Sequence, residues 1–401
     1  MPADSGFDYE ASCRRVCGVY RREPVDHIPI ISPLLGTVGA GGDIDSAHFG
    51  DWRDEERFRR VARLVQRHCD LKPPYNRVAC PRVFEPQGYQ RFLEAPQEYV
   101  ETLPPEKVSD IRTRHTSVLH TPKGDLRWTY EVDKGILTHW DMEKTVKCLE
   151  DVDKLLSVPC RFKPPASSEF DAFRQHRAAM GRNAVGGAGI NSMVAMLVGV
   201  MDYELVLEWM ATEPEAIQRL ADAWLERVGE RVDFLLKQGV GPFWHFNGVE
   251  RAAPPMMGPR QWERWVVPYD GEIMRRIKAA DPEARIHVHC HGKARTLIDS
   301  FVAMGVDSID PVEPPPQGDV DIAEVKRRYD GKMVFFGNIE FLDMETRQPD
   351  EIEELVRAAI ESSGKRNIAL MPSAGPHERP SDLMLANAER YIEAGLKYGA
   401  G

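Results

Sequence analysis

The sequence lacks the features by which several large classes of protein are recognised. No apolar run approaches the roughly 20 residues that a membrane-spanning helix needs, and the polar start, residues 1–6, has no signal-peptide core. No cluster of lysine and arginine is dense enough for a nucleic-acid surface, and the net charge of the 401 residues is -11. We therefore expect a cytoplasmic protein that binds neither membranes nor nucleic acid.

Phosphate-binding motifs are absent as well, and Cys13 and Cys17, four residues apart, have no second cysteine pair nearby. Neither GxGxxG nor GxxxxGK[ST] occurs, so the glycines at 36–42 do not predict a nucleotide site. They favour instead a loop that folds closely over a pocket. The seven cysteines are odd in number and scattered, which favours free thiols in a reducing compartment.

From residue 183 onward, strand patterns alternate with helical patterns, which predicts βαβ units and a parallel sheet. The predicted strands are 184–190, 241–247, 285–291, 306–312, 333–339 and 367–372. With 28–31 and 77–80 they number about eight, the count of a closed (β/α)8 TIM-type barrel. An open sheet is disfavoured because no dinucleotide fingerprint marks a switch point.

Residues 77–140 interrupt this alternation. Strand-like segments separated by turns, such as 121–125 and 133–135, replace the helix signals there. We therefore expect a single barrel domain over 1–401 with an antiparallel β-meander inserted at about 77–140. Such an insertion often shapes a substrate pocket.

The run from Arg285 to Gly292 contains three histidines. In a strand, His287, His289 and His291 would share one face. Buried imidazoles need hydrogen-bond partners, and they commonly serve as acids, bases or metal ligands. The run therefore predicts a functional site.

Polar residues also end the neighbouring predicted strands, where barrel enzymes keep their active sites. The predicted catalytic residues are His245, Asn247, His289, His291, Asn338 and Glu340. The predicted substrate-binding residues are Trp244, Phe246, Glu250, Asp310 and Ser373. In one interpretation His289 and His291 bind a metal ion together with a third ligand, which is Glu340, Glu250 or His245. In the alternative, these residues form a metal-free acid/base cluster.

Several segments resemble the uroporphyrinogen decarboxylase superfamily, which includes corrinoid-linked methyltransferases. The matching segments are MATEPEAIQRLADAW, MGPRQWERWVVPY, RIHVHCHG, MGVDSIDPVE, VFFGNIE and LMPSAGP. RREPVDHIPI and TVKCLEDVDKLL are similar to its methyltransferase-like branch. The resemblance implies a TIM barrel over nearly the whole chain, but it specifies the reaction poorly.

Two departures from the family pattern bear on that reaction. The decarboxylase branch carries an arginine-rich motif after its first strand, whereas residues 32–42 contain no arginine, and a substrate with many carboxylates needs several fixed cations. The thiol-methylating branch carries His-x-Cys-Gly and a second cysteine, where this chain has His291 and about Ala374. Uroporphyrinogen decarboxylation and a zinc-thiolate site are both disfavoured.

The resemblance implies a methyltransferase that moves a methyl group from a methoxy or methylamine-type small molecule to a corrinoid. No Asp-x-His-x-x-Gly motif occurs, so the corrinoid (cobalamin) would come on a partner protein or bind transiently. Zinc is a second cofactor to test, and a homodimer is left open. Two alternatives stand: a decarboxylase or lyase acting on a small carboxylic acid or tetrapyrrole-like substrate, and a non-catalytic corrinoid- or tetrapyrrole-binding protein.

Overall fold

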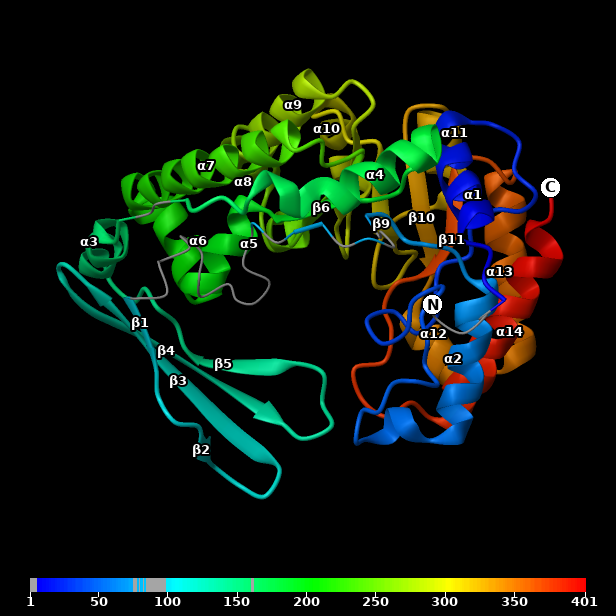
Figure 1. The fold of residues 1–401 in the computed structure, drawn as a ribbon, viewed down its shortest axis with the longest axis horizontal. Helices are drawn as coiled ribbons and strands as arrows, with labels where there is room; N and C mark the ends of the chain where they lie inside the picture. Colours follow the sequence, from blue (N-terminus) through cyan, green and yellow to red (C-terminus); the bar gives the residue numbers. More distant parts are fainter. Residues whose placement is uncertain (1–5, 75–77, 79, 82, 84–98, 160–161) are drawn as a thin grey trace.

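The computed structural model describes residues 6–74, 78, 80–81, 83, 99–159 and 162–401, and contains two sheets (Figure 1). The larger sheet has six parallel strands in the order β11-β10-β9-β8-β7-β6. These strands are β6 (Gly187–Asn191), β7 (Phe243–Asn247), β8 (Arg285–His289), β9 (Ser308–Val312), β10 (Val334–Ile339) and β11 (Ile368–Pro372). Strands adjacent in the chain are adjacent in the sheet, as successive βαβ units require.

Two extended segments continue this sheet beyond β11. Ile30 pairs in parallel with Leu370, whose amide donates a hydrogen bond to the Pro29 carbonyl at 2.8 Å. The Asp70 amide then donates to the Ile30 carbonyl at 2.6 Å. Segments 28–31 and 69–71 therefore join the six strands in barrel order, and the predicted α/β barrel class is confirmed. The strand predicted at 77–80 lies mostly outside the described residues.

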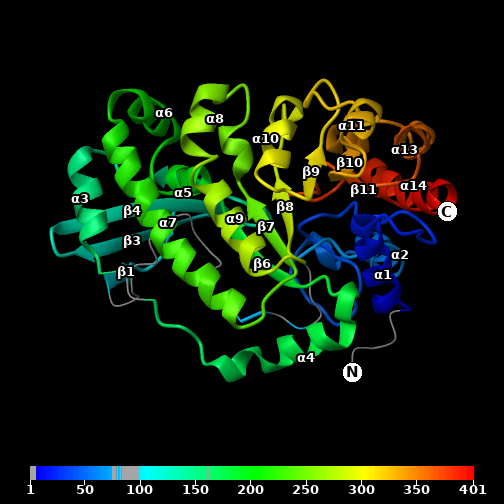
Figure 2. The same ribbon diagram turned by 90° about the horizontal axis from the view of Figure 1, so that it is seen from above.

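Helices alternate with the parallel strands and lie on their outer side (Figure 2). They are α5 (Met193–Val200), α6 (Tyr203–Thr212), α7 (Pro214–Lys237), α8 (Pro259–Trp265), α9 (Asp270–Ala280), α10 (Ile298–Ala303), α11 (Ile322–Tyr329), α12 (Phe341–Thr346), α13 (Pro349–Ser363) and α14 (Asp382–Gly399). The earlier helices are α1 (Tyr9–Arg21), α2 (Glu56–His68), α3 (Leu149–Ser157) and α4 (Asp171–Met180). Proline begins α7, α8 and α13, where its missing amide hydrogen costs no helix hydrogen bond. None of the helices in the described ranges has both the length and the apolarity to cross a bilayer.

The smaller sheet is antiparallel and projects to one side of the parallel strands (Figure 1). Its strands are β1 (Val100–Thr102), β2 (Glu106–Lys107), β3 (Arg112–Thr121), β4 (Gly124–Asp133) and β5 (His139–Glu143). The turn between β4 and β5 contacts loops of the main body: the Leu137 amide donates to the His377 carbonyl at 2.9 Å, and Trp52 Nε1 donates to the Gly135 carbonyl at 3.2 Å. Because His377 follows β11, this turn lies near the carboxyl end of the parallel sheet.

Candidate active site

Three histidines of β7 and β8 surround the carboxylate of Asp310 on β9. His287 Nε2 lies 3.0 Å from Asp310 Oδ1, and His289 Nδ1 lies 3.3 Å from Oδ2. His245 Nε2 lies 3.8 Å from Oδ1. The parallel register produces this arrangement, since His245 pairs with His287 and His289 pairs with Asp310. The structure thus brings together three predicted residues, His245, His289 and Asp310.

Lys72 supplies a cation to this cluster. Its ammonium group contacts Oδ2 of Asp310, whose side chain is fully buried. Burial alone would raise the pKa of Asp310, but the charge of Lys72 and the contacts with the neighbouring histidines lower that pKa well below its usual range. Burial lowers the pKa of His245 to about 3 and also lowers that of His287. At neutral pH the cluster therefore holds a carboxylate anion beside neutral His245 and His287 rings.

A second group of acids lies at the ends of β9 and β10. Glu313 accepts hydrogen bonds from His291 Nδ1, at 2.8 Å from Oε1, and from the Gly292 amide. Glu340 Oε2 accepts a hydrogen bond from the Ser373 hydroxyl at 3.0 Å. The other oxygen, Glu340 Oε1, is buried and has no hydrogen-bond partner in the described part of the chain. The two carboxyl groups therefore have different surroundings.

The environment of Glu340 favours its protonated form. Burial and the negative charge of Glu313 raise its pKa to about 7, although Ser373 and His291 act in the opposite direction. Burial would lower the pKa of His291, but the hydrogen bond to Glu313 raises that pKa overall. A carboxyl group that titrates near neutral pH is suited to general acid catalysis.

A hollow of about 240 Å³ opens beside Lys72. Its walls come from the loop after segment 28–31 and from residues 70–72, and its apolar side chains include Ile31, Leu35, Val38 and Leu71. Asp70, the other charged residue of its wall, is bound by Arg15. The hollow therefore offers an apolar surface that ends at a single ammonium group, next to the histidine cluster.

Sequence and structure comparisons identify the family. The model of the uroporphyrinogen decarboxylase (URO-D) family matches residues 141–396. The chain belongs to the uroporphyrinogen decarboxylase family. Uroporphyrinogen decarboxylases of Erythrobacter litoralis and Prochlorococcus marinus are 26% identical over 165 residues and 24% identical over 139 residues. These matches cover 40% and 35% of this chain but only 46% and 37% of the relatives, so the chain spans less than half of their length.

The fold of this uroporphyrinogen decarboxylase family member is also found in a methyltransferase from Methanosarcina mazei. The two structures superpose with a TM-score of 0.50 over 97% of this chain and 99% of the other, at 13% sequence identity. A likeness at this level of identity supports the shared architecture and says nothing about the substrate.

Other predicted site residues of this family member lie away from the cluster. Trp244 and Phe246 alternate with His245 on β7 and are fully buried, so they face the surrounding helices rather than the barrel interior. Neither side chain can therefore line a substrate pocket beside His245. The Asn247 carbonyl accepts a hydrogen bond from the Ser192 amide at 2.8 Å, which fixes the end of β7.

The remaining predicted residues are Asn338 and Glu250. Asn338 Nδ2 lies 3.5 Å from the Val320 carbonyl. Glu250 lies in a short 3-10 turn, and its charge contributes to raising the pKa of His291. One of its oxygens, Oε2, is buried without a hydrogen-bond partner among the residues that the structure describes.

The predicted metal ligands His289, His291 and Glu340 do not bring their ligand atoms together as one group among the described residues. His289 contacts Asp310, His291 contacts Glu313 and Glu340 contacts Ser373, although the His289 and His291 rings also lie against each other, with centroids 4.6 Å apart. The structure instead gathers His245, His287 and Asp310, whose ligand atoms all lie within 4.8 Å of one another. Strand alternation identifies a face but not which residues on adjacent strands meet, so the sequence could not single out this group.

Three residues of the site were not predicted: Lys72, His287 and Glu313. His287 shares the predicted face with His289, so the alternation already contained the signal. Glu313 directly follows the strand that ends at Val312, a position where a polar residue indicates a site. Lys72 had no comparable signal, because segment 69–71 is too short to be predicted as a strand.

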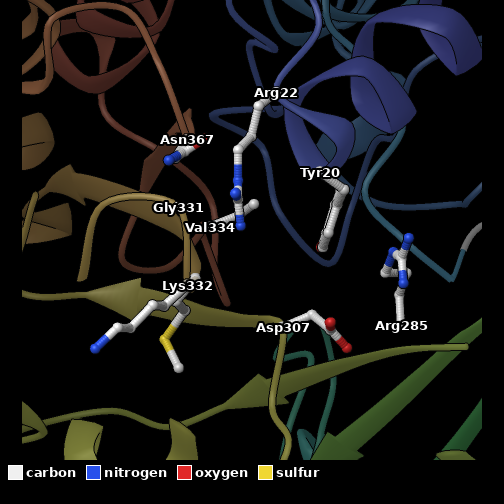
Figure 3. A pocket seen from close by; sticks show the side chains of 9 residues that line it. Tyr20, Arg22, Arg285, Asp307, Gly331, Lys332, Val334 and Asn367 are labelled. Carbon is white, nitrogen blue, oxygen red and sulfur yellow. The ribbon is translucent and has the colours of Figure 1, made fainter.

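A second hollow, of about 180 Å³, lies at the opposite end of the parallel strands (Figure 3). It is lined by residues that include Arg285, which begins β8, and Asp307, which precedes β9. Asp307 already binds Lys278 at 2.6 Å. Since active sites of barrel enzymes lie at the carboxyl ends of the strands, we assign the candidate site to the histidine and glutamate groups.

Proposed function

We propose that this chain transfers a methyl group from a methoxy or methylamine-type small molecule to a corrinoid carried by a partner protein. One observation carries the proposal: Glu340 is a buried carboxyl group at the carboxyl end of the barrel, one of its oxygens has no hydrogen-bond partner among the described residues, and the charge of Glu313 acts on it. An ether oxygen leaves readily only if it gains a proton while its bond to carbon breaks. Glu340 is suited to supply that proton, since its pKa is about 7.

The reduced corrinoid would supply the nucleophile that accepts the methyl group. The chain's own residues act on the leaving group. Protonated Glu340 donates its proton to the ether oxygen as the bond between that oxygen and the methyl carbon breaks, and the product leaves as a neutral alcohol. Glu340 then regains a proton from solvent, and His291, held by Glu313, is among the charged groups that act on it.

The hollow beside Lys72 supports a small donor. Its walls are largely apolar, and its one ammonium group already contacts Asp310. A tetrapyrrole with many carboxylates would need several cations. Lys72 is the cation that lines this hollow, and the other charged lining residue, Asp70, is an anion bound by Arg15. A methoxyaromatic compound matches these walls better.

A second candidate function is decarboxylation or another lyase reaction of a small carboxylic acid. Lys72 favours it, because an ammonium group at the end of an apolar hollow can bind one carboxylate. Membership of the uroporphyrinogen decarboxylase family also favours it.

The test is an assay of the purified chain with reduced cobalamin and a panel of methoxyaromatic and quaternary ammonium compounds. We expect release of the free phenol from at least one methoxyaromatic donor. Glu340→Gln should slow ether cleavage by about 10²–10⁴-fold but leave transfer from a quaternary ammonium donor, whose leaving amine needs no proton. Glu345→Gln, an exposed control on α12, the helix that directly follows Glu340, should behave as wild type.

Two outcomes would contradict the proposal. One is ether cleavage at full rate in Glu340→Gln. The other is CO2 release from small carboxylic acids with no demethylation of any donor, which would favour the second candidate.

A further inference from the structure

We infer that His245, His287 and Asp310 form a binding site for one divalent transition-metal ion at the base of the candidate active site. The set predicted from the sequence was His289, His291 and Glu340. The site inferred here uses other residues: one histidine of β7, the histidine in the middle of β8 and the aspartate of β9. The inference concerns ion binding alone and does not depend on the proposed methyl transfer.

The ligand atoms have the spacing of a metal site. His287 Nε2 and His245 Nε2 lie 3.0 and 3.8 Å from the same oxygen, Asp310 Oδ1, and the three atoms all fall within 4.8 Å. Metal–ligand bonds of about 2.0–2.2 Å in a tetrahedral site place ligand atoms roughly 3.2–3.6 Å apart. Small side-chain adjustments would therefore bring all three atoms onto one ion.

All three atoms are buried and lack a hydrogen-bond partner in the described structure. The 3.8 Å separation of His245 Nε2 from Asp310 is too long for a hydrogen bond, and His287 Nε2, although closer, does not have hydrogen-bonding geometry toward Oδ1. Buried polar atoms without partners are uncommon. Three of them converging on one point indicate that a cation belongs there.

The surrounding residues hold the ligands as those of metal sites do. His287 Nδ1 lies 2.7 Å from the hydroxyl of buried Ser308, which in turn lies 2.6 Å from the Tyr20 hydroxyl. With its proton on Nδ1, the His287 ring presents the Nε2 lone pair to the site. Lys72 and His289 contact Asp310 at Oδ2, which leaves Oδ1 for the ion.

The donor atoms limit the identity of the ion. Two imidazole nitrogens and one carboxylate oxygen suit Zn²⁺, Co²⁺ or Fe²⁺, whereas Mg²⁺ and Ca²⁺ prefer oxygen alone and Cu⁺ prefers sulfur. Cys290 follows β8 and is fully buried, but it does not belong to the group. We therefore expect a site without thiolate.

The experiment measures metal content by elemental analysis after loading the purified chain with Zn²⁺ and, separately, Co²⁺. We expect about one ion per chain in the wild type, loss of that ion in His245→Gln and in His287→Gln, and retention in His291→Gln. His291 is the matched control, because it is a neighbouring histidine that belonged to the set predicted from the sequence but not to this one. Circular dichroism of each variant establishes that it is folded.

Ser308→Ala provides a milder variant if the ligand substitutions prevent folding. It removes only the partner of His287 Nδ1 and should weaken Zn²⁺ binding by about 10–100-fold. The Co²⁺-loaded wild type should show visible d–d bands of a tetrahedral nitrogen and oxygen site, without a thiolate charge-transfer band. Three results would overturn the inference: no stoichiometric binding of either ion, retention of the ion in both His245→Gln and His287→Gln, or a thiolate band.

Discussion

At the level of single residues, two buried carboxyl groups of the site differ in charge at neutral pH. Asp310 lies against Lys72 and three histidines, which keep its pKa well below the usual range. Glu340 faces Glu313, and burial together with that charge raises its pKa to about 7. Two carboxyl groups whose pKa values are driven apart are typical of sites that need both an anion and an acid.

The rate of ether cleavage should therefore fall as the pH rises through about 7, because Glu340 acts only while protonated. The groups that act on Glu340 are Glu313, Asp343, His291 and Ser373. A pH–rate profile of the wild type checks this expectation. The profile of Glu340→Gln should be low and lack this decline, whereas Glu345→Gln should retain it; an unchanged decline in Glu340→Gln would assign the titration to another group.

The same shift affects stability, and the sign follows from its direction. A carboxyl group whose pKa is higher in the folded chain stabilises the fold below its unfolded pKa, which is near 4.5. That contribution is lost as the pH rises through about 7. Urea midpoints across this window should decline less in Glu340→Gln than in the wild type.

At the level of elements, the sequence was informative about strands and about the edge at which polar residues gather. The six strands from β6 to β11 overlap the predicted ones, because buried parallel strands appear as short apolar runs. Polar residues at their carboxyl ends meet because those ends share one edge of the sheet. The partners within that edge, such as Glu313 for His291, depend on register and loop conformation, which alternation does not encode.

The loop after β11 makes a close contact that tests the shape of the hollow. A Cβ atom on Gly375 would overlap the backbone of Leu35, which lines the hollow. Gly375→Ala should therefore destabilise the fold by about 1–3 kcal/mol and weaken donor binding. Gly39→Ala is the control in the facing loop, since no heavy atom of the described residues lies within 4 Å of the added carbon. Equal urea midpoints for the two variants would contradict the described packing.

At the level of the whole molecule, a parallel α/β body carries an antiparallel sheet at one side. The turn between β4 and β5 contacts the loop after β11 through the Leu137 amide. The insertion predicted at about 77–140 overlaps this sheet, which spans Val100–Glu143, whereas residues 77–98 lie mostly outside the described residues. Residues far apart in the chain, from Lys72 to Ser373, thus meet at one end of the barrel, an arrangement that local sequence patterns could not specify.

Methyl transfer is the central claim, and a methoxybenzoate labelled with ¹³C in its methoxy group tests it most directly. This donor carries both a methoxy group and a carboxylate, so one reaction with reduced cobalamin distinguishes demethylation from decarboxylation. NMR should find the ¹³C methyl group on cobalamin and an equal amount of hydroxybenzoate that retains its carboxylate. Release of CO2 with the label still on a methoxybenzene product would contradict the claim.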